Sequence, residues 1–506
     1  MNNEPPESQG LSKKLPLLSL SLILVIALAA RLPGLGSHSL SIDEAVTWFT
    51  ALRPLPAILP HMTSTCEVHP PLYFYGAHVW MLLGTSEWIM RLSSVIAGLL
   101  SIVISWLLGR ELFGGRTAIL GTLLLSLSSF HILLSQEFRM YPLIAALFTL
   151  SLFLFIRWKR GGSPGYLVLL TIVNTAGLYT HYLLFFPLVI ENCCLIADFG
   201  PSRKLLRGWI VSQCATAFLY LPWILYYLRN NKGQDLTLRD APGFWHIATL
   251  FSQMTWGPGF PAFLPERAGD GLLVGGIFTL LLSLYALRHA GREAGILCAS
   301  GLLIPLSAAV LLSRFTPFRI FEFKYFLIIA PLFFLLIALL VCSMKVKAIA
   351  ALFLALFLIT NAISWARCAW DPRYQGQNWR GASAILQKFS SDDEVIVVHP
   401  SMMSQGIFYY YGGKSLLYPV DSPDRGALLK ELEKFKRVWL CFTPHHPYVV
   451  RTGLARWMDR VLEEKNYALI PGETFIPSSV IMLKLYEVPS HKEQDHGNPP
   501  PGEGSP

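Results

Sequence analysis

The residues best suited to chemistry in this chain are two adjacent carboxylates, Asp43 and Glu44, which follow the first long apolar segment. That segment, 15–30, ends where Arg31 and Pro33 break a helix and begin a loop. The pair is therefore expected near a membrane surface, where water keeps a carboxylate ionised and a substrate with its tail in the bilayer can reach it. This combination suits a general base that acts on a lipid-linked substrate.

The same pair also has a purely structural interpretation. In the stretch Ser41-Ile42-Asp43-Glu44, the serine can cap a helix and place two acids in its first turn, where the helix dipole favours them. Capping is the commoner explanation for an isolated pair of this kind, and it is compatible with catalysis. The sequence leaves both interpretations open.

The elements that must position this pair are membrane helices. Of the 506 residues, 53% are hydrophobic and 14% are charged, which is too apolar for one soluble core and predicts a polytopic membrane protein. The net charge of +9 comes from short Lys and Arg clusters between apolar runs, so it indicates cytoplasmic turns and no nucleic-acid partner. The 8 cysteines show no CxxC or metal-ligand spacing, so no disulfide framework or zinc site is predicted.

About eleven transmembrane helices are expected from the apolar runs. Their approximate limits are 15–30, 89–108, 117–134, 142–156, 166–180, 182–197, 208–227, 271–287, 294–312, 325–341 and 348–363. With this number of spans, all the basic clusters and the N-terminus fall on one side of the membrane. The positive-inside bias identifies that side as the cytoplasm. The first segment is expected to be a retained anchor, although Ala27-Leu28-Ala29 also resembles a signal-peptidase site.

Residues 69–84 are apolar enough for a further span, but such a span would place the next basic clusters outside. They are therefore predicted to form a juxtamembrane helix with Pro70 and Pro71 in its first turn. The first external loop then covers 31–87 and carries the acid pair near its beginning. A second external stretch, 228–270, is expected to rest on the membrane surface.

A change of composition after the last span predicts a domain boundary near residue 365. Residues 366–488 are expected to form a small external α/β domain, because helix and strand patterns alternate there. The expected helices are 378–389, 403–411 and 448–464, and the expected strands are 394–399, 437–442 and 479–488. The polar, Pro/Gly-rich tail, 489–506, is expected to be disordered.

The predicted topology gathers the polar residues of several span ends in one external layer. Basic residues there run against the positive-inside bias and need a partner such as a phosphate, which makes Arg139 and Lys324 candidates for anion binding. The expected layer contains Asp43, Glu44, His69, Glu137, Arg139, His181, Arg319 and Lys324. His69 can alternatively cap its helix, and His181 can be a core histidine with its hydrogen bonds satisfied. Glu191 lies inside a span, about ten residues from this layer, and is expected to be structural.

Short motifs occur in a fixed order along residues 15–365. They are Asp43-Glu44, His69-Pro70-Pro71-Leu72-Tyr73, Arg91-Leu92, Arg110-Glu111-Leu112-Phe113-Gly114, Glu137-Phe138-Arg139-Met140-Tyr141, Thr180-His181-Tyr182 and Lys324-Tyr325. In this order they resemble the bacterial branch of the GT-C glycosyltransferases, similar to the protein O-mannosyltransferases (glycosyltransferase family 39) and the aminoarabinose transferase that modifies lipid A. Residues 378–380 and the domain after them resemble the outer C-terminal domain of that family. One departure is Lys324, where many relatives have arginine, so charge is kept but bidentate geometry is lost.

The resemblance implies a glycosyltransferase of the bacterial inner membrane with a periplasmic C-terminal domain. Its donor would be a polyprenyl-phosphate sugar, its acceptor a lipid, glycan or protein, and its surroundings membrane lipids. Asp43 would take a proton from the acceptor hydroxyl or amine, with inversion at the anomeric carbon, and Glu44 would assist it. The remaining expected binding residues are His69, Tyr73, Glu137, Arg139, Tyr141, His181, Arg319, Lys324 and Tyr325. Because the cations can stabilise the leaving phosphate, no cofactor is required, although the residues leave a divalent metal open.

Other classes of membrane protein share the polytopic composition. A secondary transporter usually places ionisable residues or broken helices near the bilayer midplane, whereas here they concentrate at the outer boundary. A non-catalytic scaffold, or a flippase of a lipid-linked substrate, would explain the aromatic external loops without needing the carboxylate pair. Consumption of an intact lipid-phosphate sugar is the observation that separates these classes.

Overall fold

The structure is a computed structural model that describes residues 6–65, 67, 69–197, 203–230, 241–258, 266–316, 320–371, 377–419, 430, 432–443, 457, 460, 462, 468–478 and 481–487. The chain divides into two compact units, Met1–Gln375 and Gly376–Pro506. Of the expected features, Arg319, the tail 489–506 and most of the helix 448–464 lie outside the described residues.

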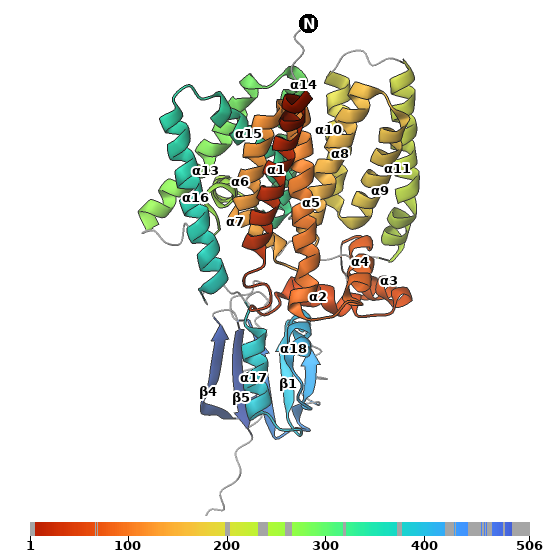
Figure 1. The fold of residues 1–506 in the computed structure, drawn as a ribbon. Helices are drawn as coiled ribbons and strands as arrows, with labels where there is room; N and C mark the ends of the chain where they lie inside the picture. The colour runs from red at the N-terminus through yellow and green to blue at the C-terminus, as the bar shows by residue number, and fades with distance from the viewer. Residues whose placement is uncertain are drawn as a thin grey trace, which may run out of the picture. The chain divides into compact units, whose positions relative to one another are not determined.

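The first unit is helical throughout its described part (Figure 1). Its helices are α1 (Pro6–Arg31), α2 (Ile42–Ala51), α3 (Leu55–Ser64), α4 (Leu72–Met81), α5 (Glu87–Phe113), α6 (Gly115–Leu127), α7 (Ser129–Ser135), α8 (Tyr141–Gly161), α9 (Pro164–Thr180), α10 (Phe185–Ala197), α11 (Arg203–Asn230), α12 (Phe244–Trp256), α13 (Glu266–Ala286), α14 (Arg292–Phe315), α15 (Ala330–Ser343) and α16 (Lys347–Trp370). Short 3-10 helices, η1 (Tyr182–Leu184), η4 (Leu287–His289) and η5 (Phe323–Ile329), precede or extend some of them.

The apolar runs of the sequence form the long helices of this bundle. Among the described residues, 6 helices are long and apolar enough to cross a membrane, and the bent pair α6 and α7 makes up to 7. Shorter apolar helices at Leu17–Arg31, Tyr182–Ala197 and Leu273–His289 occupy three more of the predicted spans. The predicted polytopic helical fold is therefore confirmed. Its hydrophobic runs form helices because the bilayer offers no water to the backbone, so each backbone N–H and C=O must be hydrogen-bonded within the helix.

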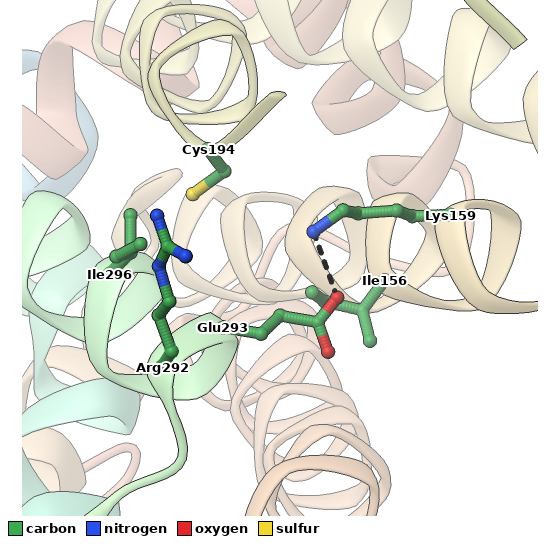
Figure 2. Close-up of a pocket in the computed structure, with 6 residues that line it drawn as sticks. All are labelled: Ile156, Lys159, Cys194, Arg292, Glu293 and Ile296. Atoms are coloured by element: carbon green, nitrogen blue, oxygen red, sulfur yellow. Dashed lines mark hydrogen bonds and ion pairs between the residues drawn. The ribbon is translucent and has the colours of Figure 1, made fainter. Parts of the chain in front are cut away.

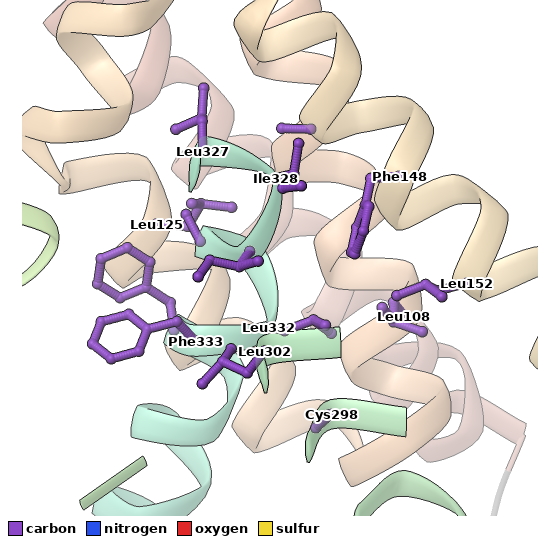
Figure 3. Packing of buried hydrophobic residues seen from close by; sticks show 14 of the residues in the cluster. Leu108, Leu125, Phe148, Leu152, Cys298, Leu302, Leu327, Ile328, Leu332 and Phe333 are labelled. Atoms are coloured by element: carbon purple, nitrogen blue, oxygen red, sulfur yellow. The ribbon is translucent and has the colours of Figure 1, made fainter. Parts of the chain in front are cut away.

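Two helices form the centre of the bundle. The apolar window of α15 is 89% buried and that of α8 is 72% buried, whereas those of α11 and α16 are each only 28% buried. Side chains such as Phe148, Leu332 and Phe333 interdigitate in this core (Figure 3). The outer helices keep their apolar faces exposed, as expected for lipid contact.

The break between α6 and α7 is held by a buried arginine at the end of α1. The two helices meet at an angle of 61°. The Arg31 guanidinium donates to the carbonyl of Ser126 at 3.2 Å and contacts His131 Nδ1 at 2.7 Å. The next residue after α7, Gln136, donates through Nε2 to the Arg31 carbonyl at 2.9 Å. The first helix is thus tied to the break and to the loop that follows α7.

The segments expected to lie at the membrane surface differ from one another. The predicted juxtamembrane segment contains α4, whose ten residues span only about 15 Å, too short to cross a bilayer. The second external stretch instead contributes α12 to the bundle. Leu250, Phe251 and Met254 of α12 are fully buried in the same core as α15, so this helix packs into the bundle, while residues 231–240 and 259–265 of the stretch lie outside the described residues.

The second unit contains a mixed sheet with two described helices. Its strands are β1 (Val395–His399), β2 (Leu416–Pro419), β3 (Arg437–Phe442), β4 (Ala468–Ser478) and β5 (Ile481–Glu487), and its helices are α17 (Trp379–Phe389) and α18 (Ser404–Tyr410). The strand order is β2-β1-β3-β5-β4, with β1 parallel to β2 and β3, and β5 antiparallel to β3 and β4. The predicted α/β class is confirmed, while β2 and β4 were not predicted.

Candidate active site

Helix α2 begins with a capping box that involves only one of the two acids. Ser41 Oγ accepts from the backbone N–H of Glu44 at 3.3 Å, and the Glu44 carboxylate accepts from the backbone N–H of Ser41 at 2.8 Å. This is the reciprocal arrangement that satisfies two free donors at a helix N-terminus. The structural interpretation of the sequence therefore applies to Glu44 and leaves the Asp43 carboxylate free for other contacts.

Glu44 is also held by a buried ion pair. Its carboxylate accepts from Arg91 Nε at 2.7 Å and Nη2 at 2.9 Å, and from the backbone N–H of Phe138 at 2.8 Å. Arg91 lies on α5 and donates further to the carbonyls of Leu35, His38 and Ser39. Because its oxygens are occupied, Glu44 serves to fix α2 against α5 and the loop after α7.

Asp43 faces the start of the span formed by η5 and α15. Its Oδ2 accepts a hydrogen bond from Lys324 Nζ, and both side chains keep about 30% of their surface exposed. Burial alone would raise the pKa of Asp43, but the positive charges of Lys324 and Arg139 outweigh it and lower that pKa below its ordinary value. Asp43 is therefore an ionised carboxylate that water or a substrate can reach.

Arg139 packs against the same helix from the loop between α7 and α8. Its Nη1 donates to Thr47 Oγ1 at 2.8 Å and to the Asp43 carbonyl at 3.2 Å. The residue is only 4% exposed, and its Nε has no hydrogen-bond partner among the described residues. Despite burial, the charges of Tyr141 and Asp43 raise the pKa of Arg139, so it remains a cation.

Glu137, two residues earlier, has a different environment. Burial raises its pKa to about 7; Lys324 opposes the shift, and the carboxylates of Glu44 and Asp43 add to it. Its Oε2 is buried without a hydrogen-bond partner in the described part of the chain. The site thus combines one carboxylate that is firmly ionised with one whose charge changes near neutral pH.

The two predicted histidines lie side by side. The rings of His69 and His181 are 4.9 Å apart, and His181 in turn packs on Tyr325 at 5.1 Å. His69 Nδ1 contacts the Glu67 carboxylate at 2.5 Å, and His181 Nδ1 accepts from the backbone N–H of Leu183 at 3.1 Å. Burial, His69 and Arg139 hold the pKa of His181 well below its usual range, so it is neutral.

Three tyrosines surround these charges. The Lys324 ammonium lies 5.5 Å from the centre of the Tyr141 ring, which is 6.2 Å from the Tyr325 ring. Tyr73 of α4 packs on Phe138 at 6.4 Å, and burial raises its pKa. Aromatic faces beside a cation stabilise positive charge and give flat surfaces on which a sugar ring can rest.

Five polar atoms of this cluster are buried without a hydrogen-bond partner among the described residues. They are His69 Nε2, Tyr73 Oη, Glu137 Oε2, Arg139 Nε and His181 Nε2. Buried polar groups in folded proteins are nearly always paired, so several unmet atoms in one place need an explanation. Their mixture of donors and acceptors suits a polar ligand with an anionic group.

The structure thus brings nine of the residues predicted from the sequence together with Asp43 through direct or shared contacts. They are Glu44, His69, Tyr73, Glu137, Arg139, Tyr141, His181, Lys324 and Tyr325. Glu191 stands apart, where it accepts from Ser151 at 2.5 Å and from Asn174 at 3.2 Å inside the bundle. Within the described ranges, no group of three His, Cys, Asp or Glu side chains is placed to hold a metal, and no step below is assigned to one.

A second polar region lies near the far end of α8. A cavity of about 170 Å³ is lined there by Ile156, Lys159, Cys194, Arg292, Glu293 and Ile296 (Figure 2). Lys159 follows Tyr141 by 18 helical residues, which corresponds to about 27 Å along the axis. This cavity is therefore separate from the Asp43 cluster, and its Lys159 is paired with Glu293 at 3.0 Å.

Comparison with known proteins places this fold in a class. Residues 68–232 match the family model for dolichyl-phosphate-mannose-protein mannosyltransferase, a range that contains His69, Arg139 and His181 but not Asp43 or Lys324. No curated protein sequence matches the chain. Together with the solved structures below, this match confirms the resemblance to GT-C glycosyltransferases.

Several solved structures have a similar fold, and two of them are described with a bound isoprenoid phosphate. ArnT from Cupriavidus metallidurans in the apo state has a TM-score of 0.61 at 12% identity, covering 94% of this chain and 98% of ArnT. ArnT bound to undecaprenyl phosphate has a TM-score of 0.57 at 13% identity, covering 93% and 97%. The oligosaccharyltransferase AglB from Archaeoglobus fulgidus, in complex with an inhibitory peptide and a dolichol-phosphate, has a TM-score of 0.54 at 13% identity, covering 90% and 73%.

Proposed function

We propose that this protein transfers a sugar from a polyprenyl-phosphate donor to an acceptor at the outer face of the membrane, with Asp43 as the general base. The observation that carries the proposal is the contact of an ionised, partly exposed Asp43 with Lys324 and Arg139, beside buried polar atoms that lack partners. A base and an anion-binding pair are the two parts that displacement of a phosphate by a hydroxyl or amine requires.

The similar structures support the class of donor. ArnT is described with undecaprenyl phosphate and AglB with a dolichol-phosphate, so both bind a phosphate on a long isoprenoid tail. In this chain the cations lie where the spans begin, next to helices with exposed apolar faces. A lipid tail can therefore stay in the bilayer while its phosphate reaches Lys324 and Arg139.

The geometry suggests how donor binding activates the base. The donor phosphate competes with Asp43 for Lys324, and the added negative charge also raises the proton affinity of the Asp43 carboxylate. The acceptor oxygen or nitrogen then attacks the anomeric carbon as its proton passes to Asp43. The bond from that carbon to the phosphate oxygen breaks, its electron pair stays on the phosphate, and the configuration inverts. Arg139 and Lys324 stabilise the phosphate charge that develops.

The orientation in the membrane follows from the basic clusters. We place the N-terminus in the cytoplasm of a bacterial cell, and the Asp43 cluster and the α/β unit (366–488) on the periplasmic side of its inner membrane. Reporter fusions after Pro60 and Gly412 should then report an external location, and a fusion after Lys204 a cytoplasmic one. The reverse pattern at all three positions would put the site on the wrong face for the proposed acceptor.

Donor consumption tests the reaction itself. Purified protein in lipid nanodiscs is incubated with a polyprenyl-phosphate sugar pool and membrane acceptors, and free polyprenyl phosphate is followed by mass spectrometry. Release of polyprenyl phosphate together with a glycosylated acceptor is the expected result. Donor binding without release of polyprenyl phosphate would favour a function that leaves the lipid-linked sugar intact.

Movement of the intact lipid is the second candidate function. The 61° break between α6 and α7 is the feature that favours it, since broken helices are common in transporters. A flippase would carry the donor across a sealed vesicle without cleaving it. The same mass-spectrometric assay separates the two functions, because only a transferase produces free polyprenyl phosphate.

A further inference from the structure

Glu67, a residue that the sequence did not single out, fixes the orientation of His69. The two residues lie between α3 and α4, and one carboxylate oxygen of Glu67 accepts from both His69 Nδ1, at 2.5 Å, and the His69 backbone N–H, at 3.2 Å. The two side chains are only 10% and 12% exposed. A carboxylate that holds both the ring and its own backbone leaves the imidazole one orientation.

The hydrogen bonds of His69 and His181 place the ring protons of the two histidines on different nitrogens. An ionised carboxylate can only accept, so His69 carries a proton on Nδ1, and its Nε2 either has a lone pair or bears a second proton. His181 Nδ1 instead accepts from the Leu183 N–H, so its single proton is on Nε2. Protonation of His181 would break that backbone bond. His69 is therefore the member of the pair that can gain and lose a proton.

The charged and titratable groups around His69 come from several elements. The carboxylates of Glu67, in the same loop, and Asp43, on α2, interact electrostatically with its ring. Neutral His181 packs on it, with Tyr325 behind, and Arg139 acts on both Glu67 and His181. Two carboxylates and one cation thus lie close enough to act on this part of the site. His69 Nε2 is buried and has no partner among the described residues.

We propose that Glu67 and His69 form a carboxylate–imidazole pair that delivers a proton to the departing phosphate, which makes His69 a second catalytic residue. The inference rests on the proposed function. As the bond from the anomeric carbon to the phosphate oxygen breaks, the electron pair passes to the phosphate, and the Nε2 proton of His69 passes to a phosphate oxygen. Asp43 meanwhile receives the acceptor proton. After product release Asp43 loses its proton and His69 regains one, so protons balance over the cycle.

The test is the pH dependence of transfer in full-length protein with variants at Glu67 and His69. Because proton delivery requires a protonated His69 ring, transfer should fall at alkaline pH. Glu67→Gln keeps an acceptor oxygen but removes the negative charge beside the ring, so the alkaline fall should begin at lower pH than in wild type. His69→Gln should remove that fall and lower transfer by about 10²-fold, the lower end of general acid–base effects. His78→Gln is the matched control, because His78 lies on α4 and bonds the Ala51 carbonyl at 2.8 Å.

A measurement without substrate separates this inference from the proposed function. Nitrogen-15 NMR of labelled histidines, with His69 assigned through His69→Gln, should show a ring protonated on Nδ1 that titrates at lower pH in Glu67→Gln. If wild-type protein consumes no lipid-phosphate sugar while this titration is seen, the proposed function fails and so does the catalytic role of His69. If transfer occurs but Glu67→Gln and wild type share one alkaline fall, only the proton delivery is overturned. A His69 ring with its single proton on Nε2 would also overturn it.

Discussion

Charged side chains cluster at both ends of helix α8, but the hydrogen bonding of the two clusters differs. Near Gly161, the ion pairs are Arg157 and Arg160 with Glu111, and Lys159 and Arg160 with Glu293, at 2.7–3.3 Å. Near Tyr141, Arg139 is only 4% exposed while Asp43 and Lys324 keep about 30% of their surface, and Glu137 Oε2 and Arg139 Nε are buried without hydrogen-bond partners among the described residues. Charge is common to both regions, and only the second holds polar groups that the described chain does not satisfy.

The difference teaches what marks a site in a membrane bundle. Ion pairs close to water contribute little, because solvent screens them and the long side chains lose freedom. Buried charges are costly unless their hydrogen bonds are met, so a cluster that leaves them unmet persists for a reason other than stability. Within the Tyr141 end the two adjacent acids also differ, since Glu44 is buried with both oxygens paired, whereas Asp43 pairs with Lys324 and keeps 31% of its side-chain surface exposed.

The largest expected effect is at Asp43. Asp43→Asn keeps the size of the side chain and removes its basicity, so transfer should fall by about 10²–10⁴-fold. Folding should survive, because Glu44 and Ser41 make the cap. Rates of donor consumption are compared with Asp392→Asn, which neutralises an exposed aspartate paired with Lys414. Wild-type rates in Asp43→Asn would end the assignment of this residue as the base.

Glu44→Gln should act on stability first. It leaves the buried Arg91 guanidinium without a countercharge, and loss of one partner of a buried pair costs about 3–5 kcal/mol. Thermal unfolding of the detergent-solubilised protein measures this loss. Glu111→Gln, at the other end of α8, is the matched control and should change the midpoint little. Equal unfolding midpoints for Glu44→Gln and Glu111→Gln would mean that the greater burial of Glu44 adds no stability.

Lys324→Gln should weaken binding of undecaprenyl phosphate by about 10- to 100-fold, the usual worth of a hydrogen bond to a charged group. Lys324→Arg keeps the charge and should retain most of the affinity. Titration of each variant with undecaprenyl phosphate, with Lys347→Gln as an exposed control, gives the dissociation constants. An unchanged constant in Lys324→Gln would limit Lys324 to its contact with Asp43.

The smallest effect is expected at Glu293. Glu293→Gln removes a partly exposed carboxylate, so stability should change by about 1 kcal/mol or less and transfer should be unaffected. Unfolding midpoints and donor consumption are measured together. A loss of transfer as large as that of Asp43→Asn would show that both ends of α8 serve the reaction.

Much of the fold could be predicted because apolar runs must become helices in a membrane. The packing of α12 into the bundle was not predicted, because aromatic residues suit a membrane interface and a packed core equally well. The clustering of Asp43 with Arg139 was anticipated from basic residues on the side that normally lacks them. The contact of Asp43 with Lys324, which is 281 residues away in the sequence, could not be predicted from the spacing of motifs.

The parts of the site that were missed depend on three-dimensional pairing. Arg91 occurs in a recognised motif, but its bidentate contact with Glu44 joins residues 47 apart on different helices. Glu67 carries no signal in the sequence, since a single acid in a polar loop is usually solvated. Its role depends on the bend that brings it onto the His69 ring.

The arginine that ends α1 also has a consequence for how the protein is made. Two of the groups that meet the Arg31 guanidinium, the Ser126 carbonyl and the His131 ring, are 95 and 100 residues further along the chain. Synthesis delivers α1 to the membrane before either group exists, so its cationic end must wait in the headgroup region. Arg31 can make these contacts only after α6 and α7 have been inserted. Gln136, which follows α7, then hydrogen-bonds to the Arg31 carbonyl at the start of the first loop. We therefore expect the Arg31 contacts at the start of the first loop to form only after insertion of the third predicted span.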